Sequence, residues 1–214
     1  MNNIRFLSRV LASSTHEMQN IMAIINESAG LGGDVLRLNG PPRMKHGDKL
    51  FEALDTVAAQ VERGRQLMDA LNLCAHAASA EYELLELNHF CAYTVQLAER
   101  MTRLGECRLV FVPDAQRLLV CADGYIFMQG LHRAIELVLD CCLPGEEISV
   151  SLLPVPERQE VALLVRARIR KPGQTVKADE KLDELTARLG ARLSYAEESL
   201  SLSFGLTRNG QGAA

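Results

Sequence analysis

The stretch SSTHEMQNIMAIINESAGL, Ser13 to Leu31, has the hydrophobic pattern of an amphipathic helix and decides the N-terminal part of the fold. Apolar side chains recur along one helical face at Met18, Ile21, Met22, Ile25 and Ala29. With about 100° of rotation per residue, His16 and Asn20 point away from that stripe. The pattern therefore predicts a helix that holds an imidazole toward water, with the Glu17 carboxylate next to it and an amide one turn further on.

Residues 3–38 predict one long helix, and residues 49–77 predict a second. The apolar stripe of the second helix is Leu50, Leu54, Val57, Val61, Leu67 (or Met68) and Leu71. The segment LNGPPRMKHGD (38–48) between them is a loop by its glycine, proline and asparagine content. Two long helices joined by a short loop form an antiparallel hairpin, which here has apolar surface on more than one flank and no third helix to cover it. Because pairing two copies gives a four-helix bundle, we expect a homodimer.

A second domain follows the hairpin, in which short strands alternate with helices in the order β-α-β-β-α-β-β-α-β-β. Its first strand lies in YELLELN (82–88), and the strands of CRLVFVPD (107–114) and QRLLVCAD (116–123) flank a Pro-Asp turn. This order predicts an α+β sandwich, a sheet with helices on one face. We expect a helical hairpin over residues 1–78, the α+β domain over 79–208 and a disordered tail over 209–214.

Composition limits the possible functions of the chain. The 214 residues are 48% hydrophobic and 23% charged, as in soluble globular proteins, and the net charge of −4 lacks the basic surplus of nucleic-acid binders. The sequence contains no run of 18 apolar residues, so we expect no transmembrane helix. Arg5 and Arg9 interrupt the N-terminal apolar run, so we expect no signal peptide. The six cysteines show no C-x-x-C spacing, so we interpret them as buried apolar residues of a reducing, cytoplasmic compartment.

His16-Glu17-Met18-Gln19-Asn20 matches H-E-x-x-N, the start of the phosphorylation motif of two-component histidine kinases. The chain resembles the core of that family over nearly its whole length, with Ile21 where the family usually has proline. Its hairpin resembles the dimerisation and histidine-phosphotransfer domain, and its second domain resembles the ATP-binding domain. Three further segments carry the likeness: the run Asp123, Phe127, Gln129, Leu131 before the family's N box, and the closing helix and hairpin in LTARLGARLSYAEESLSLSFGL.

The nucleotide-binding residues of the family are missing. The asparagines of the N box, which hold Mg²⁺ against ATP, are replaced at the corresponding positions by Arg133 and Leu137, and leucine has no oxygen ligand. Neither the adenine-binding aspartate of D-x-G-x-G nor the glycine-rich lid follows the strand EVALLVRARI. We therefore expect no ATP binding and no autophosphorylation from ATP. We also expect Arg133 to pair with Glu136, although His132 and Arg133 could instead line a vestigial pocket.

This combination resembles a smaller group of bacterial histidine phosphotransferases, in which a dimeric hairpin carries a degenerate ATPase domain. The resemblance implies that His16 takes a phosphoryl group from a receiver-domain aspartate of a hybrid kinase and passes it to a response regulator. It further implies that Glu17 polarises the other ring nitrogen, and that Asn20 touches the incoming phosphoryl group or positions water. No cofactor is implied, because Mg²⁺ and the aspartate would belong to the partner.

The resemblance also implies where a receiver domain docks: on the outer face of the first helix below His16, around Met22, Ala23 and Ile24. Two alternatives stay open. The chain could be a pseudokinase adaptor that docks on a kinase or regulator without transferring phosphate, or a phosphatase that drains a receiver domain. A kinase with an unusual nucleotide site is a third reading, which the missing nucleotide residues disfavour. A lone helical histidine would ordinarily be just a solvated residue.

Overall fold

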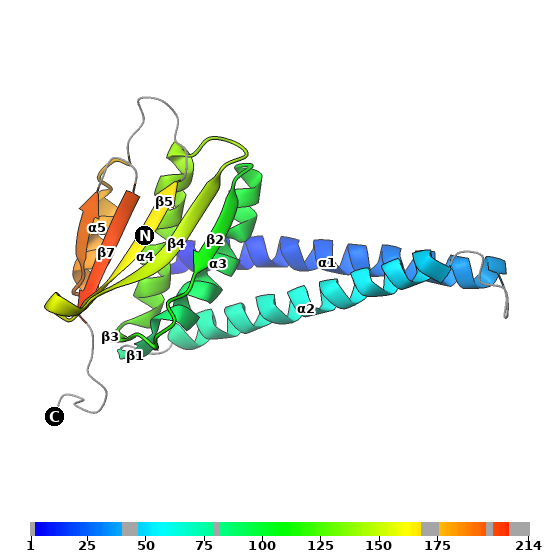
Figure 1. Ribbon diagram of the computed structural model, residues 1–214, viewed down its shortest axis with the longest axis horizontal. Helices are drawn as coiled ribbons and strands as arrows, with labels where there is room; N and C mark the ends of the chain where they lie inside the picture. Colours follow the sequence, from blue (N-terminus) through cyan, green and yellow to red (C-terminus); the bar gives the residue numbers. More distant parts are fainter. Residues whose placement is uncertain (1–2, 40–46, 79–81, 168–175, 196–198, 206–214) are drawn as a thin grey trace. The chain divides into compact units, whose positions relative to one another are not determined.

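The computed structural model describes residues 3–39, 47–78, 82–167, 176–195 and 199–205. Its elements, in chain order, are α1 (Asn3–Asn39), α2 (Gly47–Ala77), β1 (Glu83–Glu86), α3 (Leu87–Leu104), β2 (Arg108–Val112), β3 (Leu119–Ala122), α4 (Gly124–Cys141), β4 (Glu147–Val155), β5 (Glu160–Ala167), α5 (Glu180–Arg188), β6 (Arg192–Tyr195) and β7 (Ser199–Gly205). A short 3₁₀ turn, Pro156–Arg158, joins β4 to β5. The predicted helical hairpin followed by an α/β domain is thereby confirmed (Figure 1).

The chain divides into two compact units, Asn3–Asp69 and the chain from Ala70 onward. The first unit holds α1 and most of α2, which pack together through a periodic inner face. On α1 this face contains Val10, Ile21 and Val35, and on α2 it contains Leu50 and Leu67, all less than 9% exposed. Gly64 of α2 faces α1, where an added Cβ atom would be 3.7 Å from Ile21 Cγ2. No described helix is both long and apolar enough to span a membrane.

The single apolar stripe predicted for each hairpin helix is in fact two stripes. On α1, Ile21 is buried whereas Met22 is 50% exposed; on α2, Leu50 is buried whereas Leu54 and Val61 are more than half exposed. The exposed members recur every seven residues: Met22, Ala29 and Leu36 on α1, and Leu54, Val61 and Met68 on α2. One face of each helix is therefore used within the hairpin, and a second apolar face is left on its surface.

The second unit is built on a five-stranded sheet with the order β2-β4-β5-β7-β6, accompanied by the small antiparallel pair β1-β3. Strands β2 and β4 run parallel, and every other neighbouring pair is antiparallel. The predicted closing hairpin is present as β6–β7, and β4 and β5 form another antiparallel hairpin. The two strands predicted on either side of Pro113-Asp114 are present as β2 and β3, but they do not pair with each other: β2 pairs with β4, and β3 pairs with β1.

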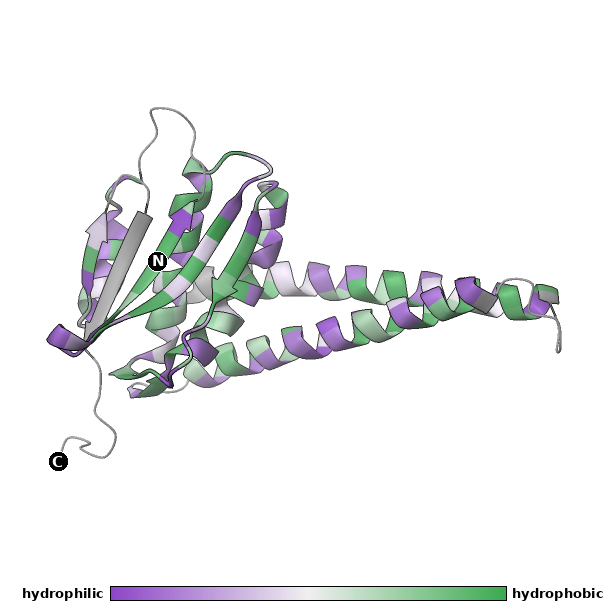
Figure 2. Cartoon of the chain, viewed as in Figure 1, coloured by the Kyte–Doolittle hydropathy of each residue, from purple (hydrophilic) through white to green (hydrophobic). Residues whose placement is uncertain are grey.

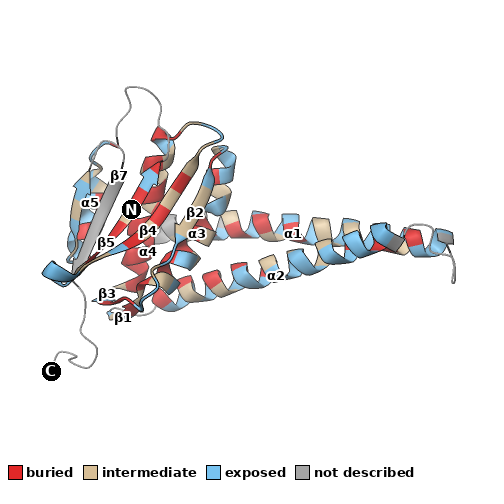
Figure 3. Ribbon diagram, in the orientation of Figure 1, coloured by how far each residue is buried: buried red, intermediate tan, exposed pale blue. Residues whose placement is uncertain are grey.

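Helices α3, α4 and α5 cover one face of this sheet, as predicted (Figure 1). The residues beneath them alternate along the strands: Ile148, Val150 and Leu152 on β4 lie opposite Ala167, Val165 and Leu163 on β5, and all six are buried. Figure 2 shows how apolar β4 and β5 are, and Figure 3 shows α4 largely buried above them. Helix α4 can be buried on most sides because its sequence, GYIFMQGLHRAIELVLDC, carries few charges.

Aspartates begin two of these helices. The Asp123 carboxylate accepts a hydrogen bond from the N–H of Ile126 at the start of α4, and Asp179 does the same for Leu182 at the start of α5, both at 2.9 Å. Such caps satisfy backbone donors that the first turn leaves unpaired. Asp179 is thereby fixed in place, which matters for the ion pair described below.

The cysteine interpretation needs one correction. All six cysteines are free thiols, and Cys74, Cys91, Cys107, Cys141 and Cys142 are buried as predicted, but Cys121 is exposed. Cys121 lies in the short strand β3, where its neighbours Val120 and Ala122 face inward and the alternation of the strand turns Cys121 outward. The predicted tail over 209–214 lies outside the described residues.

Candidate functional site

The structure places His16 on the solvent-exposed side of α1, as its sequence position predicts. Asn20 follows one turn later and is exposed as well. Residues four apart on a helix lie on the same face, so the imidazole and the amide share one surface. A nucleophile on a rigid helix and open to water can enter a pocket on another protein, which a buried histidine could not do.

Glu17 is not a solvated neighbour of His16. Its residue is only 7% exposed, and its carboxylate forms an ion pair with Arg63 on α2, with 2.5 Å between Oε1 and Nη2. Arg63 is likewise not a freely solvated side chain, since it is 33% exposed and paired with Glu17. The physical reason is the 100° rotation per residue, which turns Glu17 from the His16 side toward α2.

The three predicted docking residues do not form one patch. Met22 is 50% exposed, Ala23 is exposed, and Ile24 is half-buried. Successive helical residues point about 100° apart, so Ala23 falls on the same side as His16, Met22 falls on a different flank, and Ile24 leans toward α2. Of the three, Ala23 is the residue that shares the His16 surface.

A second charged cluster occupies the C-terminal unit, at the position that corresponds to the family's N box. Arg133 on α4 donates hydrogen bonds to Asp179 from Nε (3.1 Å) and Nη2 (2.5 Å), and to Glu136 from Nη1 (2.8 Å). The Arg133 side chain is 25% exposed and both carboxylates are 17% exposed. The predicted Arg133–Glu136 pair is confirmed, and Asp179 is a further partner.

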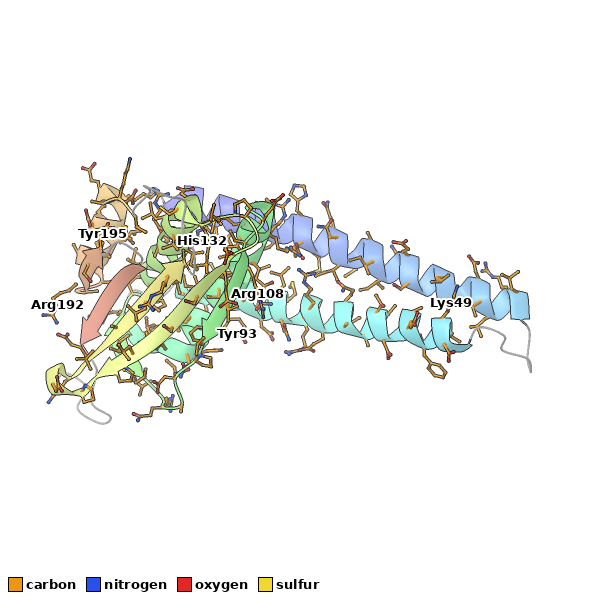
Figure 4. All side chains as sticks on the ribbon, turned by 45° about the horizontal axis from the view of Figure 1, so that its top comes forward. Lys49, Tyr93, Arg108, His132, Arg192 and Tyr195 are labelled. Atoms are coloured by element: carbon orange, nitrogen blue, oxygen red, sulfur yellow. The ribbon has the colours of Figure 1, made fainter. Side chains whose placement is uncertain are left out.

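Neighbouring groups hold this cluster in place. The Tyr195 hydroxyl on β6 accepts a hydrogen bond from the Asp179 N–H (3.1 Å) and donates one to Asp183 (3.2 Å), which places Tyr195 beside α5 (Figure 4). The bidentate hydrogen bond with Asp179 raises the pKa of Arg133, and the same bond lowers the pKa of Asp179. Both groups therefore stay charged in the folded protein.

The surface beside this cluster is acidic. An open hollow of about 590 Å³ at the start of α5 is lined by Asp179, Glu180, Lys181 and Glu184. Because Asp179 is paired with Arg133, Glu180 and Glu184 outweigh Lys181 by one negative charge, which disfavours a polyphosphate. Within the described ranges, no group of three or more histidine, cysteine, aspartate or glutamate side chains could hold a metal ion.

Asp179 and Arg63 were not identified as site residues from the sequence, for different reasons. Asp179 carried a local signal, since an aspartate directly before the helical stretch EKLDEL is a typical N-cap. Its bond to Arg133, however, joins residues 46 positions apart and has no local signature. Arg63 is likewise 46 positions from Glu17, and only the register of the hairpin brings them together.

The histidine kinase core is the class of structure to which the chain is similar. No protein-family model and no curated protein sequence matches it. Among solved structures, the histidine kinase AdeS of Acinetobacter baumannii is 13% identical, with a TM-score of 0.49 over 90% of this chain and 98% of that one. The cytoplasmic segment of the histidine kinase QseC is 9% identical, with a TM-score of 0.48 over 69% of this chain and 95% of that one.

A bacterial phosphotransferase is a third similar structure. It is 12% identical, with a TM-score of 0.46, over 95% of this chain and 97% of that one. At such identities the likeness does not extend to the side chains of a site. The function proposed below is accordingly inferred from the residues of this chain.

Proposed function

We propose that this protein is a histidine phosphotransferase that relays phosphoryl groups between receiver-domain aspartates through His16, without binding ATP. Two features support this proposal. The first is the exposed imidazole of His16, which lies on a long helix within the H-E-x-x-N motif. The second is the ion-pair cluster around Arg133, which fills the position where the family binds its nucleotide. The first feature supplies a phosphoryl acceptor. The second leaves a partner protein, rather than ATP, as the phosphoryl donor.

The transfer step needs little from the protein beyond position. A neutral ring nitrogen of His16 attacks the phosphorus of an aspartyl phosphate, a P–N bond forms, and the P–O bond to the partner's carboxylate breaks. The carboxylate leaves with the bonding electrons, and the other ring nitrogen gives up its proton to solvent. Mg²⁺ and the aspartate come from the receiver domain, so that His16 mainly has to be presented in line. Asn20, on the same face, is positioned to contact the phosphoryl oxygens.

Arg133 is the main support for the nucleotide-free part of the proposal. A guanidinium group at the N-box position cannot hold Mg²⁺, since it offers five donors and no acceptor. It is also held by two carboxylates that are mostly buried. Displacing it would take the cation away from two carboxylates that are mostly buried, which is costly. The acidic hollow beside α5 adds repulsion against phosphate groups.

The partners that fit this proposal are receiver domains, met on the outer face of α1 around His16 and Ala23. A homodimer would present two such faces, because the exposed heptad stripes lie on another flank of the hairpin. The transient contact with a receiver domain and the permanent contact between hairpins would then use different surfaces.

Transfer from a labelled receiver domain tests the proposal. Receiver domains of the same organism, phosphorylated with labelled acetyl phosphate and freed from it, are mixed with the wild-type protein or with His16→Gln. We expect acid-labile label on the wild type and none on the variant. His89→Gln, which changes an exposed histidine on α3 away from the proposed site, serves as the matched control and should be labelled.

Other outcomes point to the alternatives. If the label leaves the receiver domain only as inorganic phosphate, and does so only when this protein is present, the protein is a receiver phosphatase. Binding of a receiver domain with no label on the wild type indicates a pseudokinase adaptor. Both outcomes contradict the relay.

A further inference from the structure

We propose that Arg63 is a positioning residue of the His16 site, which neutralises Glu17 so that an anionic phosphoryl group can approach and reside on the imidazole. This inference rests on the proposed function, because it concerns the same site, and it adds a residue that the motif does not contain. Arg63 acts here through Glu17, and it need not touch the phosphoryl group.

The ion pair begins one residue after the acceptor, about 100° further around α1. Glu17 is the next residue after His16, and its carboxylate lies 2.5 Å from the Arg63 guanidinium. The Glu17 side chain is 10% exposed, so it cannot swing into bulk water without giving up its packing against α2. A carboxylate held this firmly contributes a fixed negative charge to the surroundings of the imidazole unless a cation is held with it.

Charge counting shows why the cation matters. A phosphoryl group on a ring nitrogen brings up to two negative charges, and Glu17 would add a third one residue away. Arg63 cancels the charge of Glu17 and leaves the site close to neutral before the phosphoryl group arrives. The nearest other arginine on α2, Arg65, is taken up by Glu62 and Asp69, with hydrogen bonds of 2.7 Å to each.

The probe for this inference is phosphoramidate, a small phosphoryl donor that requires no partner protein. The neutral ring nitrogen attacks phosphorus, the P–N bond of phosphoramidate breaks, and ammonia leaves and takes up the ring proton as ammonium. The initial rate of phosphohistidine formation at residue 16 is measured by ³¹P NMR or intact mass. Four variants are compared with the wild type: Arg63→Gln, Arg63→Lys, Glu17→Gln and the double variant Glu17→Gln/Arg63→Gln.

We expect Arg63→Gln to load roughly three- to tenfold more slowly than the wild type, since an uncompensated charge several ångströms away is only partly screened. Arg63→Lys keeps the charge and should stay within about twofold of the wild type. The double variant removes both charges, so it should load faster than Arg63→Gln. The deficit of Arg63→Gln should shrink in 0.5 M salt, where the Debye length falls to roughly 4 Å.

A purely structural role for Arg63 predicts a different pattern. In that case the double variant would load as slowly as Arg63→Gln, or more slowly, and salt would not change the deficit. Either result overturns the inference, as would equal rates for Arg63→Gln and the wild type, or a wild type that phosphoramidate does not label. Failure of the proposed function is recognised separately, by a wild type that phosphoramidate labels but no receiver domain does.

Discussion

At the scale of single residues, Arg133 joins α4 to the first turn of α5 and should be important for the stability of the C-terminal unit. Arg133→Ala would leave Asp179 and Glu136 without their cation in a mostly buried site. We expect a loss of about 1–3 kcal/mol in the free energy of unfolding, below the full cost of breaking a completely buried pair. Urea unfolding followed by circular dichroism measures it.

Arg192→Ala is the matched control for this prediction. Arg192 also pairs with a carboxylate, that of Glu160, but its side chain is 63% exposed. An exposed ion pair contributes about 0–1 kcal/mol. If Arg192→Ala proved as destabilising as Arg133→Ala, the Arg133 cluster would contribute no more to stability than an exposed ion pair, which would contradict the prediction.

Asp179 gives this cluster a dependence on pH. Its hydrogen bond to Arg133 lowers its pKa in the folded state, so the carboxylate stabilises the fold fully above the unfolded-state pKa of about 4. That contribution is lost as the pH falls through the lower, folded-state pKa. We expect Asp179→Asn to be less stable than the wild type at pH 7, with a gap that narrows as the pH falls below about 4. Thermal unfolding at pH 7, 5, 4 and 3 measures the gap, and a constant gap would contradict the assignment.

The sequence revealed the exposure of His16 better than the environment of Glu17. Helical rotation alone places His16 away from the apolar stripe, and this local argument needs no partner helix. Whether Glu17 faces water depends on which flank of α1 meets α2, and that is set by packing between residues about 46 positions apart. The same reasoning found Glu136 for Arg133, one turn away, and missed Asp179.

At the scale of elements, Gly64 tests how α1 and α2 pack. An added Cβ would lie 3.7 Å from Ile21 Cγ2 and 4.0 Å from Met18 Sδ, which are ordinary contact distances. Alanine also favours a helix over glycine by up to about 1 kcal/mol. Gly64→Ala should therefore stabilise the hairpin by roughly 0.5–1 kcal/mol. Gly64→Leu should destabilise it, because a larger side chain forces Ile21 and Met18 aside.

Thermal unfolding of both Gly64 variants checks this packing. A destabilising alanine would mean that the helices lie closer than the structure has them. A neutral leucine would mean that they lie further apart. The two substitutions thus bracket the spacing from both sides.

Element order was the most predictable part of the fold, and strand pairing the least. Hydrophobic periodicity and caps such as Asp123 are local, so the order of helices and strands predicted for the second unit agrees with the observed one. The parallel pairing of β2 with β4 joins segments separated by a whole helix, and nothing in CRLVFVPD shows it. For the same reason, two apolar stripes on each hairpin helix were taken for one.

At the scale of the whole molecule, the exposed apolar stripes predict a homodimer. Met22 and Leu36 on α1, and Leu54 and Val61 on α2, are each about half exposed or more, and a soluble protein rarely leaves such a stripe open. Light scattering should give twice the 23.6 kDa of one chain. Leu54→Glu with Val61→Glu should give a folded monomer, and Ala59→Glu, elsewhere on the surface of α2, should remain a dimer. A wild-type monomer would contradict the prediction.

Passage of a phosphoryl group through His16 is the most direct test of the account. The wild-type protein is first loaded by a labelled receiver domain and purified. It is then mixed with unlabelled receiver domains in Mg²⁺ without nucleotide. A parallel sample of unloaded protein is given labelled ATP and no receiver domain. The account predicts that acid-labile label leaves His16 and reappears as a base-labile acyl phosphate on a receiver aspartate, with no label from ATP. Label taken directly from ATP, or label that never moves from His16 to a receiver, would contradict it.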